Sequence, residues 1–153
     1  MAEPLHFEDF AVGRRFRCGT RRVDAEAIKA FARDYDPQPF HVDDAKAADS
    51  FFKGLAASGW HTAAMCMRLL VDGLPIAGGI ISAGGTLEWK LPVRPGDTLG
   101  VEAEVLEARA SRSRPEQGLV KLRISTRNQH GEDVQVFSPT VFVPRRASAG
   151  AGA

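Results

Sequence analysis

A carboxylate and an imidazole lie five residues apart in the segment Asp36-Pro-Gln-Pro-Phe-His41. Two prolines restrain this backbone, so both side chains can be directed toward one point at little further cost in conformational entropy. Such a pair suits proton transfer, because the two groups can grip one water molecule, one group accepting its proton while the other supplies a proton elsewhere. The alternative is structural: Asp36 would order a turn, and His41 would be an ordinary loop histidine.

A helix is predicted directly before this pair. Asp24 can cap a helix over residues 25–35, in which apolar residues recur at helical spacing. The prolines that follow Asp36 push the residues before them out of the helical region, so the helix is expected to end near Asp36. Residues 36–41 are then expected to form a stiff, non-helical loop. A short helix through Ala48, opening at Asp43 or Asp44, is predicted to follow.

A second long helix is predicted over Ser58–Val71, with Ser58 as its N-cap and Gly73 and Pro75 beyond its end. Its residues are apolar nearly all round, which predicts a buried helix. Gly59 would lie in its first turn, where backbone N–H groups have no intrahelical partner and the helix dipole favours negative charge. These donors suit an oxyanion that forms during a reaction. Alternatively, Gly59 only permits close packing of the helix on a sheet.

The second half of the chain has the pattern of an antiparallel sheet. Turn-forming residues separate the expected strands, and such short connections favour antiparallel pairing. Strands are predicted over four segments: Gly78–Lys90, Leu99–Ala110, Leu119–Asn128 and Val134–Pro144. Phe7–Val23 is expected to be an extended stretch with turns. The sequence therefore predicts an α+β domain over residues 1–146, followed by a disordered tail over residues 147–153.

The composition excludes several classes of protein. The chain has 153 residues, with 20 basic and 19 acidic residues, so the formal net charge is +1. This balance argues against a nucleic-acid polycation or a protein drawn to an anionic membrane. We find no signal peptide, no membrane span, no metal motif and no nucleotide-binding glycine motif, and expect a cytoplasmic protein. The two cysteines, Cys18 and Cys66, are expected to be reduced and buried.

A string of spaced residues carries a resemblance to a known family. Asp36-x-x-Pro39-x-His41, followed by Phe52, Gly54 and Ala57-Ser-Gly59, resembles the hydratase motif of the MaoC-like dehydratases, the R-specific enoyl-CoA hydratases. Leu87–Asp97 looks like the strand and turn of that family. The resemblance covers the chain from about Phe7 to Pro144. It implies a hot-dog fold, in which an antiparallel sheet wraps around a long central helix, assembled as a homodimer or higher homo-oligomer with acyl-CoA near the subunit interface.

The resemblance also implies roles for individual residues. Asp36 and His41 match the catalytic pair of the family, and Gly59 matches the glycine whose backbone N–H holds the thioester oxygen. The implied reaction is reversible hydration of a trans-2-enoyl-CoA to an (R)-3-hydroxyacyl-CoA in fatty acid metabolism, with the CoA thioester as substrate and no cofactor. Which of Asp36 and His41 is the base stays open. Two positions depart from the family pattern: Gln38 replaces the usual asparagine and Ser58 the usual histidine.

Two other functions are compatible with the same fold. One is an acyl-CoA thioesterase, although Ser58–Val71 holds no acidic residue of the kind found on the central helix of such enzymes. The other is a non-catalytic subunit that binds acyl-CoA. His61 is expected to be structural. Some aromatic and apolar residues near the loop are candidates to line an acyl pocket: Phe40, Phe51, Phe52, Leu55 and Trp60. Candidates to meet CoA phosphates, with none assigned, are Arg94, Arg112, Arg114, Arg145 and Arg146.

Overall fold

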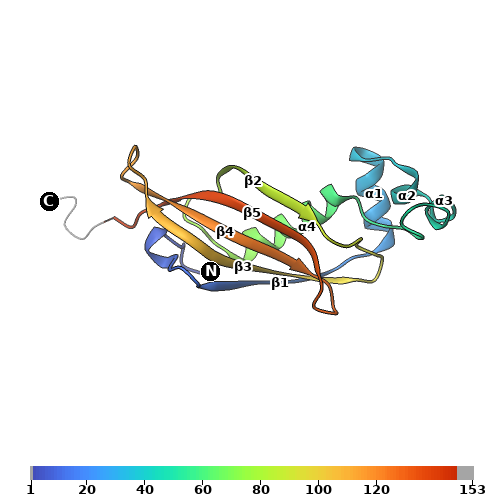
Figure 1. The fold of residues 1–153 in the computed structure, drawn as a ribbon, viewed down its shortest axis with the longest axis horizontal. Coiled ribbons are helices and arrows are strands. Elements are labelled where there is room, and N and C mark those ends of the chain that lie inside the picture. The colour runs from blue at the N-terminus through green and yellow to red at the C-terminus, as the bar shows by residue number, and fades with distance from the viewer. Residues whose placement is uncertain (1, 148–153) are drawn as a thin grey trace.

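The computed structural model describes residues 2–147 and shows one antiparallel sheet with a long helix along it (Figure 1). The strands are β1 (Arg15–Arg22), β2 (Ser82–Trp89), β3 (Thr98–Ala110), β4 (Gln117–Arg127) and β5 (Asp133–Pro144). The helices are η1 (Phe7–Asp9), α1 (Ala25–Tyr35), α2 (Pro39–Val42), α3 (Asp44–Ala48) and α4 (Gly59–Gly73). The sheet order is β1-β3-β4-β5-β2. This arrangement confirms the expected α+β class and hot-dog fold.

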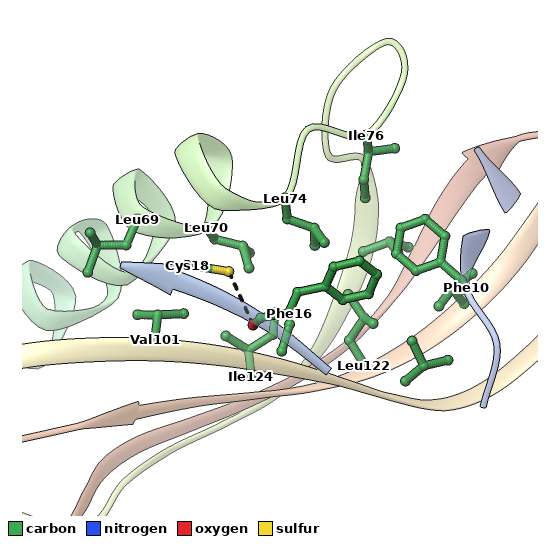
Figure 2. Close-up of a cluster of buried hydrophobic side chains, with 14 of the residues drawn as sticks. Phe10, Phe16, Cys18, Leu69, Leu70, Leu74, Ile76, Val101, Leu122 and Ile124 are labelled. Carbon is green, nitrogen blue, oxygen red and sulfur yellow. Dashed lines mark hydrogen bonds between the residues drawn. The ribbon is translucent and has the colours of Figure 1, made fainter. Parts of the chain in front are cut away.

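The main hydrophobic core lies between α4 and the face of the sheet that it covers. Alternate residues of β3 and β4 point toward the helix, and the register places Ala103 opposite Ile124. Figure 2 shows Leu69 and Leu70 of α4 directed at Val101 and Ile124 across the core. All of these side chains are buried, so they are removed from water together when the helix docks. Burial of this face fixes α4, and therefore its first turn, relative to the sheet.

One face of α4 is not covered, which contradicts the prediction that the helix is buried all round. Trp60, Met67 and Val71 expose 60%, 39% and 51% of their surface. The reason is geometric: a single sheet covers only one side of a helix, whereas the apolar residues of α4 are spread around the helix. The uncovered side therefore carries exposed apolar residues, beside the ion pair of Arg68 and Asp72.

The segment between α1 and α4 leaves the sheet and gathers as short helices at one end of the molecule (Figure 1). Helix α1 begins after Asp24, whose side chain accepts a hydrogen bond from the Ala27 N–H at 2.8 Å, and ends at Tyr35 as predicted. Residues 36–41 are not helix-free, however, because α2 forms one turn over Pro39–Val42. Proline is favoured at the first position of a helix, where its missing N–H is no loss. Pro39 therefore starts a helical turn here, while the residue before it stays extended.

The predicted strands are confirmed, and β3, β4 and β5 begin and end within two residues of expectation. The β2 segment is shorter than predicted, because residues 78 and 79 form a glycine turn with positive φ before the strand begins. Cys18 and Cys66 are buried free cysteines, as expected. No helix within residues 2–147 is long and apolar enough to cross a bilayer. The tail predicted from residue 147 lies, apart from Ala147, outside the described residues.

Candidate active site

Asp36 and His41 come together although different elements carry them. Asp36 caps the C-terminus of α1, where its backbone N–H donates to the Ala32 carbonyl at 2.8 Å. His41 lies in α2, and its Nε2 is 3.3 Å from Asp36 Oδ2. The imidazole is buried, whereas the carboxylate keeps 17% of its side-chain surface exposed. The turn from α1 into α2 therefore places a buried imidazole against a partly accessible carboxylate.

A backbone carbonyl fixes the orientation of the imidazole. His41 Nδ1 lies 2.6 Å from the carbonyl oxygen of Ala56, which can only accept a hydrogen bond. Nδ1 therefore carries the proton and donates it to Ala56. In the neutral ring this leaves the lone pair of Nε2 pointing toward Asp36. A base whose other nitrogen is held by a fixed acceptor has a defined tautomer and direction.

The carboxylate of Asp36 is stabilised in its charged form. Burial raises the pKa of this carboxyl, but hydrogen bonds from the Ser58 hydroxyl and the Gln38 amide, together with the charge of His41, outweigh burial and lower the pKa below its usual value. The Gln38 Nε2 donates to Asp36 Oδ1 at 2.6 Å. Asp36 is therefore an anion in the neutral pH range.

Both positions that depart from the family pattern affect the carboxylate of Asp36. The longer side chain of Gln38 still brings its amide to Asp36. Ser58 is fully buried and caps α4 by accepting a hydrogen bond from the Trp60 N–H at 3.2 Å. Its hydroxyl also helps to lower the pKa of Asp36. The sequence identified Ser58 only as a helix cap, because its distance from Asp36 depends on how α4 meets α1. A small hydroxyl residue directly before the predicted glycine was the available signal.

Gly59 opens α4 at the point where the helix meets the edge strand β2. Within residues 2–147 its backbone N–H donates no hydrogen bond. A Cβ atom at this position would lie 2.5 Å from Cε2 of Trp89, closer than real Cβ contacts. Trp89 is held there by a hydrogen bond from its Nε1 to Gln135 Oε1 at 3.0 Å. Both interpretations of Gly59 are thus compatible with the structure. The close packing on Trp89 requires that this residue have no side chain, and within the described residues its N–H is free to donate.

A pocket of about 470 Å³ connects the three predicted site residues. Its walls are mostly apolar, which is typical of sites that bind small molecules with an apolar portion. Asp36, His41 and Gly59 all line it, as do four of the predicted aromatic and apolar residues, Phe40, Phe51, Phe52 and Trp60, together with Trp89 and residues 90–93. Leu55 packs in a core cluster instead.

The arginines considered for CoA lie elsewhere. Arg94 donates to backbone carbonyls, and Arg145 and Arg146 pair with Glu8 and Asp9 at the N-terminal end of the chain. Among the described residues that line the pocket, Lys90 is the cation. Within residues 2–147 no group of three or more His, Cys, Asp or Glu side chains gathers in a way that could hold a metal ion.

His61 lies outside the pocket, as expected of a structural histidine. Its ring stacks on Phe31 of α1 with centroids 4.7 Å apart, and its Nδ1 is buried without a hydrogen-bond partner. Burial, with a smaller contribution from Arg21, lowers the pKa of this imidazole against the opposing effect of Asp24. His61 therefore packs α4 against α1 in its neutral form.

Known proteins match this chain over most of its length. Residues 9–128 match the family described as MaoC like domain. The crystal structure of a MaoC-like dehydratase from Rhodospirillum rubrum is 55% identical, with a TM-score of 0.91 over 94% of this chain and 99% of that one. An (R)-specific enoyl-CoA hydratase from Aeromonas caviae is 34% identical over 67% of this chain and 75% of its own length. The uncharacterized protein YdeM of Bacillus subtilis is 33% identical over 91% of this chain and 97% of its own length.

Proposed function

Because the chain belongs to the family of MaoC-like dehydratases, we propose that it adds water reversibly to a trans-2-enoyl-CoA and forms the (R)-3-hydroxyacyl-CoA. The observation that carries this proposal is the convergence of Asp36, His41 and the Gly59 N–H on one apolar pocket. The relative from Aeromonas caviae is named for the same reaction and the same stereochemistry. The enzyme would be a lyase that acts on a CoA thioester, with no further cofactor in the step.

In the proposed step, one water molecule lies between Asp36 and His41. Asp36 accepts a hydrogen bond from one O–H of this water and orients the molecule, but does not take its proton, since a carboxyl whose pKa is lowered is a weak proton acceptor. His41 Nε2 takes the other proton, because Nδ1 already donates to Ala56. The water oxygen then bonds to the β-carbon of the enoyl group, and the electrons of the double bond move onto the thioester as an enolate.

The Gly59 N–H donates to the enolate oxygen, which carries the new negative charge. Its position at the first turn of α4 adds the favourable end of the helix dipole. The proton on His41 Nε2 passes to the α-carbon, which completes the addition of H and OH and returns the imidazole to its starting state. The apolar walls exclude other water molecules and strengthen these interactions.

The test measures loss of the conjugated enoyl-thioester absorbance with purified protein and enoyl-CoAs of several chain lengths. Asp36→Asn and His41→Ala are expected to lower kcat/KM by at least about 10²-fold, the usual contribution of a positioned acid or base. Asp34→Asn and His130→Ala are matched controls on exposed positions and should keep the wild-type rate. Wild-type rates in the two site variants would overturn the mechanism. Release of free CoA thiol would indicate a thioesterase, and binding without turnover would indicate a non-catalytic subunit.

We also propose that a second copy of this chain covers the uncovered face of α4 and the neighbouring edge of β2. Strand β2 pairs with β5 on one side, and its other edge is unpaired within residues 2–147. Trp60 of α4 contacts Trp89 of this edge, with ring centroids 5.1 Å apart. The exposed large apolar residues of α4 and of the β2 segment are Trp60, Met67, Val71, Ile81 and Trp89. Light scattering on the eluting protein should give at least twice the mass of one chain.

A further inference from the structure

The loop from Ser50 to Leu55 forms one wall of the pocket. Its own hydrogen bonds are local: the Lys53 N–H donates to the Ser50 carbonyl at 3.1 Å and the Gly54 N–H to the Ala47 carbonyl at 3.0 Å. Phe51 is 90% exposed, although its ring contacts Phe52 edge-on at a centroid distance of 5.5 Å. Lys53 has φ of 56°, the left-handed conformation that residues with a Cβ rarely adopt, and Gly54 follows with φ of 153°. Such a backbone persists only where surrounding contacts hold it.

Arg94, which directly follows the pocket-lining Val93, adds the long-range contacts that hold this loop. Its guanidinium donates to the carbonyls of Gly54 at 2.8 Å and Leu55 at 3.3 Å, and also to the carbonyl of Phe52. A planar guanidinium carries several donors in a fixed fork, so one side chain can hold three successive parts of a loop. The reach is long in sequence, since some 40 residues separate Arg94 from its acceptors.

Hydrogen bonds hold the backbone that carries the Arg94 side chain. The Arg94 N–H donates to Asp97 Oδ2 at 2.8 Å, and the Asp97 N–H donates back to the Arg94 carbonyl at 3.1 Å. The same turn is tied to the end of β1, because the Gly96 N–H donates to the Val23 carbonyl at 2.7 Å. Next to it, the Val93 carbonyl accepts from Ala57 at 2.9 Å. Because this turn is fixed to the end of β1, the Arg94 side chain holds the loop at a defined position relative to the sheet.

The held loop is connected to the proposed catalytic pair. The Phe52 ring packs on Phe40 with centroids 5.0 Å apart and lies 6.1 Å from the His41 ring, and the loop residues Phe51 and Phe52 both line the pocket. Release of the loop would thus enlarge the apolar part of the pocket without removing any group that touches the reacting atoms.

We propose that Arg94 is a positioning residue, whose guanidinium holds the Ser50–Leu55 loop against the pocket and thereby selects the length of the acyl chain that binds. The part that concerns acyl chains rests on the proposed function. The part that concerns the loop does not. We therefore assign Arg94 to the loop and not to a CoA phosphate, because its Nη1 and Nη2 both donate to the protein's own backbone.

Two readouts test this inference without requiring turnover. The first is cleavage by trypsin after Lys53, an exposed residue in the loop, followed by mass spectrometry of the fragments. The second is binding of butyryl-CoA and octanoyl-CoA, followed by fluorescence of Trp60 and Trp89, the two tryptophans of the chain, which both line the pocket. The variant is Arg94→Met, and the matched control is Arg112→Met in the exposed turn between β3 and β4.

Arg94→Met is expected to raise the rate of cleavage at Lys53 about tenfold or more, since several hydrogen bonds from a charged donor are lost together. The ratio of the two acyl-CoA dissociation constants should change about fivefold or more, since a few methylene groups gain or lose contact with the wall. Guanidinium chloride at about 20 mM, far below denaturing concentrations, should restore both values. Arg112→Met should match the wild type in both assays.

Unchanged cleavage at Lys53 in Arg94→Met would overturn the inference that Arg94 holds the loop. Faster cleavage with an unchanged ratio of dissociation constants would overturn the role of the loop in chain-length selection. If Arg94→Met does not fold, Arg94→Lys keeps the charge but not the fork, and it should show the same changes to a smaller degree. A wild-type protein that binds both acyl-CoAs but hydrates no enoyl-CoA would refute the proposed reaction, while these two readouts would still decide the inference.

Discussion

Replacement of Gly59 by alanine tests how tightly α4 meets the edge strand. The added Cβ would lie 2.5, 2.7 and 2.8 Å from three atoms of the Trp89 indole, whereas ordinary carbon contacts are about 3.5–4.0 Å. The ring must therefore move by about 1 Å. That movement stretches the 3.0 Å hydrogen bond from Trp89 Nε1 to Gln135, whose side chain is fully buried.

Two costs add in Gly59→Ala. Overpacking of a core costs about 1–3 kcal/mol, and the low end of this range applies because Trp89 is 45% exposed; a buried amide left without its partner costs about 1–3 kcal/mol. We expect a loss of about 2–4 kcal/mol in the free energy of unfolding, because the alanine offsets part of this cost by favouring the helix. For a chain of this size that loss corresponds to a fall of about 5–15 °C in Tm. Urea unfolding and thermal melts measure both quantities.

The matched control is Gly100→Ala in β3, where a Cβ would meet Thr20 at an ordinary 3.5 Å. Its stability should change by less than about 1 kcal/mol. A second variant, Gly59→Ala with Trp89→Leu, removes the clashing ring, so the alanine should cost less in that background. A Tm for Gly59→Ala within the error of the wild-type value, or the same cost of the alanine with and without Trp89, would refute the account of this contact.

Further variants test the electrostatics and the uncovered surface. Ser58→Ala removes a hydroxyl that helps to lower the pKa of Asp36, so the pKa of that carboxyl, followed by NMR titration, should rise, while Ser58→Thr keeps the wild-type value. His61 is buried with a lowered pKa, so the unfolded chain binds its proton more tightly; stability is complete above the ordinary histidine pKa of about 6.5 and falls as the pH drops below it. In His61→Phe the free energy of unfolding, measured with urea, should lose this pH dependence, which amounts to at most about 1.4 kcal/mol per pH unit. His130→Phe should leave the pH dependence unchanged. Val71→Asp puts a charge on the uncovered face of α4 and should reduce the mass measured by light scattering to that of one chain; an unchanged mass would place the subunit contact elsewhere.

Much of the fold could be predicted from local sequence patterns. Alternating residues identified β3, β4 and β5, and the cap at Asp24 with the prolines after Asp36 set both ends of α1. The helical turn α2 was missed because proline stops one helix and starts another equally well, so only the surrounding packing decides. The uncovered face of α4 was missed because an all-apolar helix carries no sign of how many partners cover it.

The site was harder to predict, because its geometry depends on contacts between distant elements. The spacing from Asp36 to His41 identified the pair, since five residues of restrained backbone bring them together. The sequence could not show that Ala56 orients the imidazole or that Arg94 is used by backbone carbonyls. Each of these contacts joins residues 15 or more positions apart, where no local pattern limits the distance.

Asp36, His41 and Gly59 all belong to a single stretch of 24 residues that begins where α1 ends and closes where α4 begins. Of the strands in residues 2–147, β2 alone contributes to the same pocket, through Trp89, and residues 90–93 that follow it complete the wall. Chemistry and substrate choice are therefore encoded largely apart from the strands that build the core. Residues 36–59 should therefore be exchangeable between relatives as one block, provided that the buried residues of the block that pack against Leu99 and Val134 keep their size and that Arg94 and Trp89 are retained.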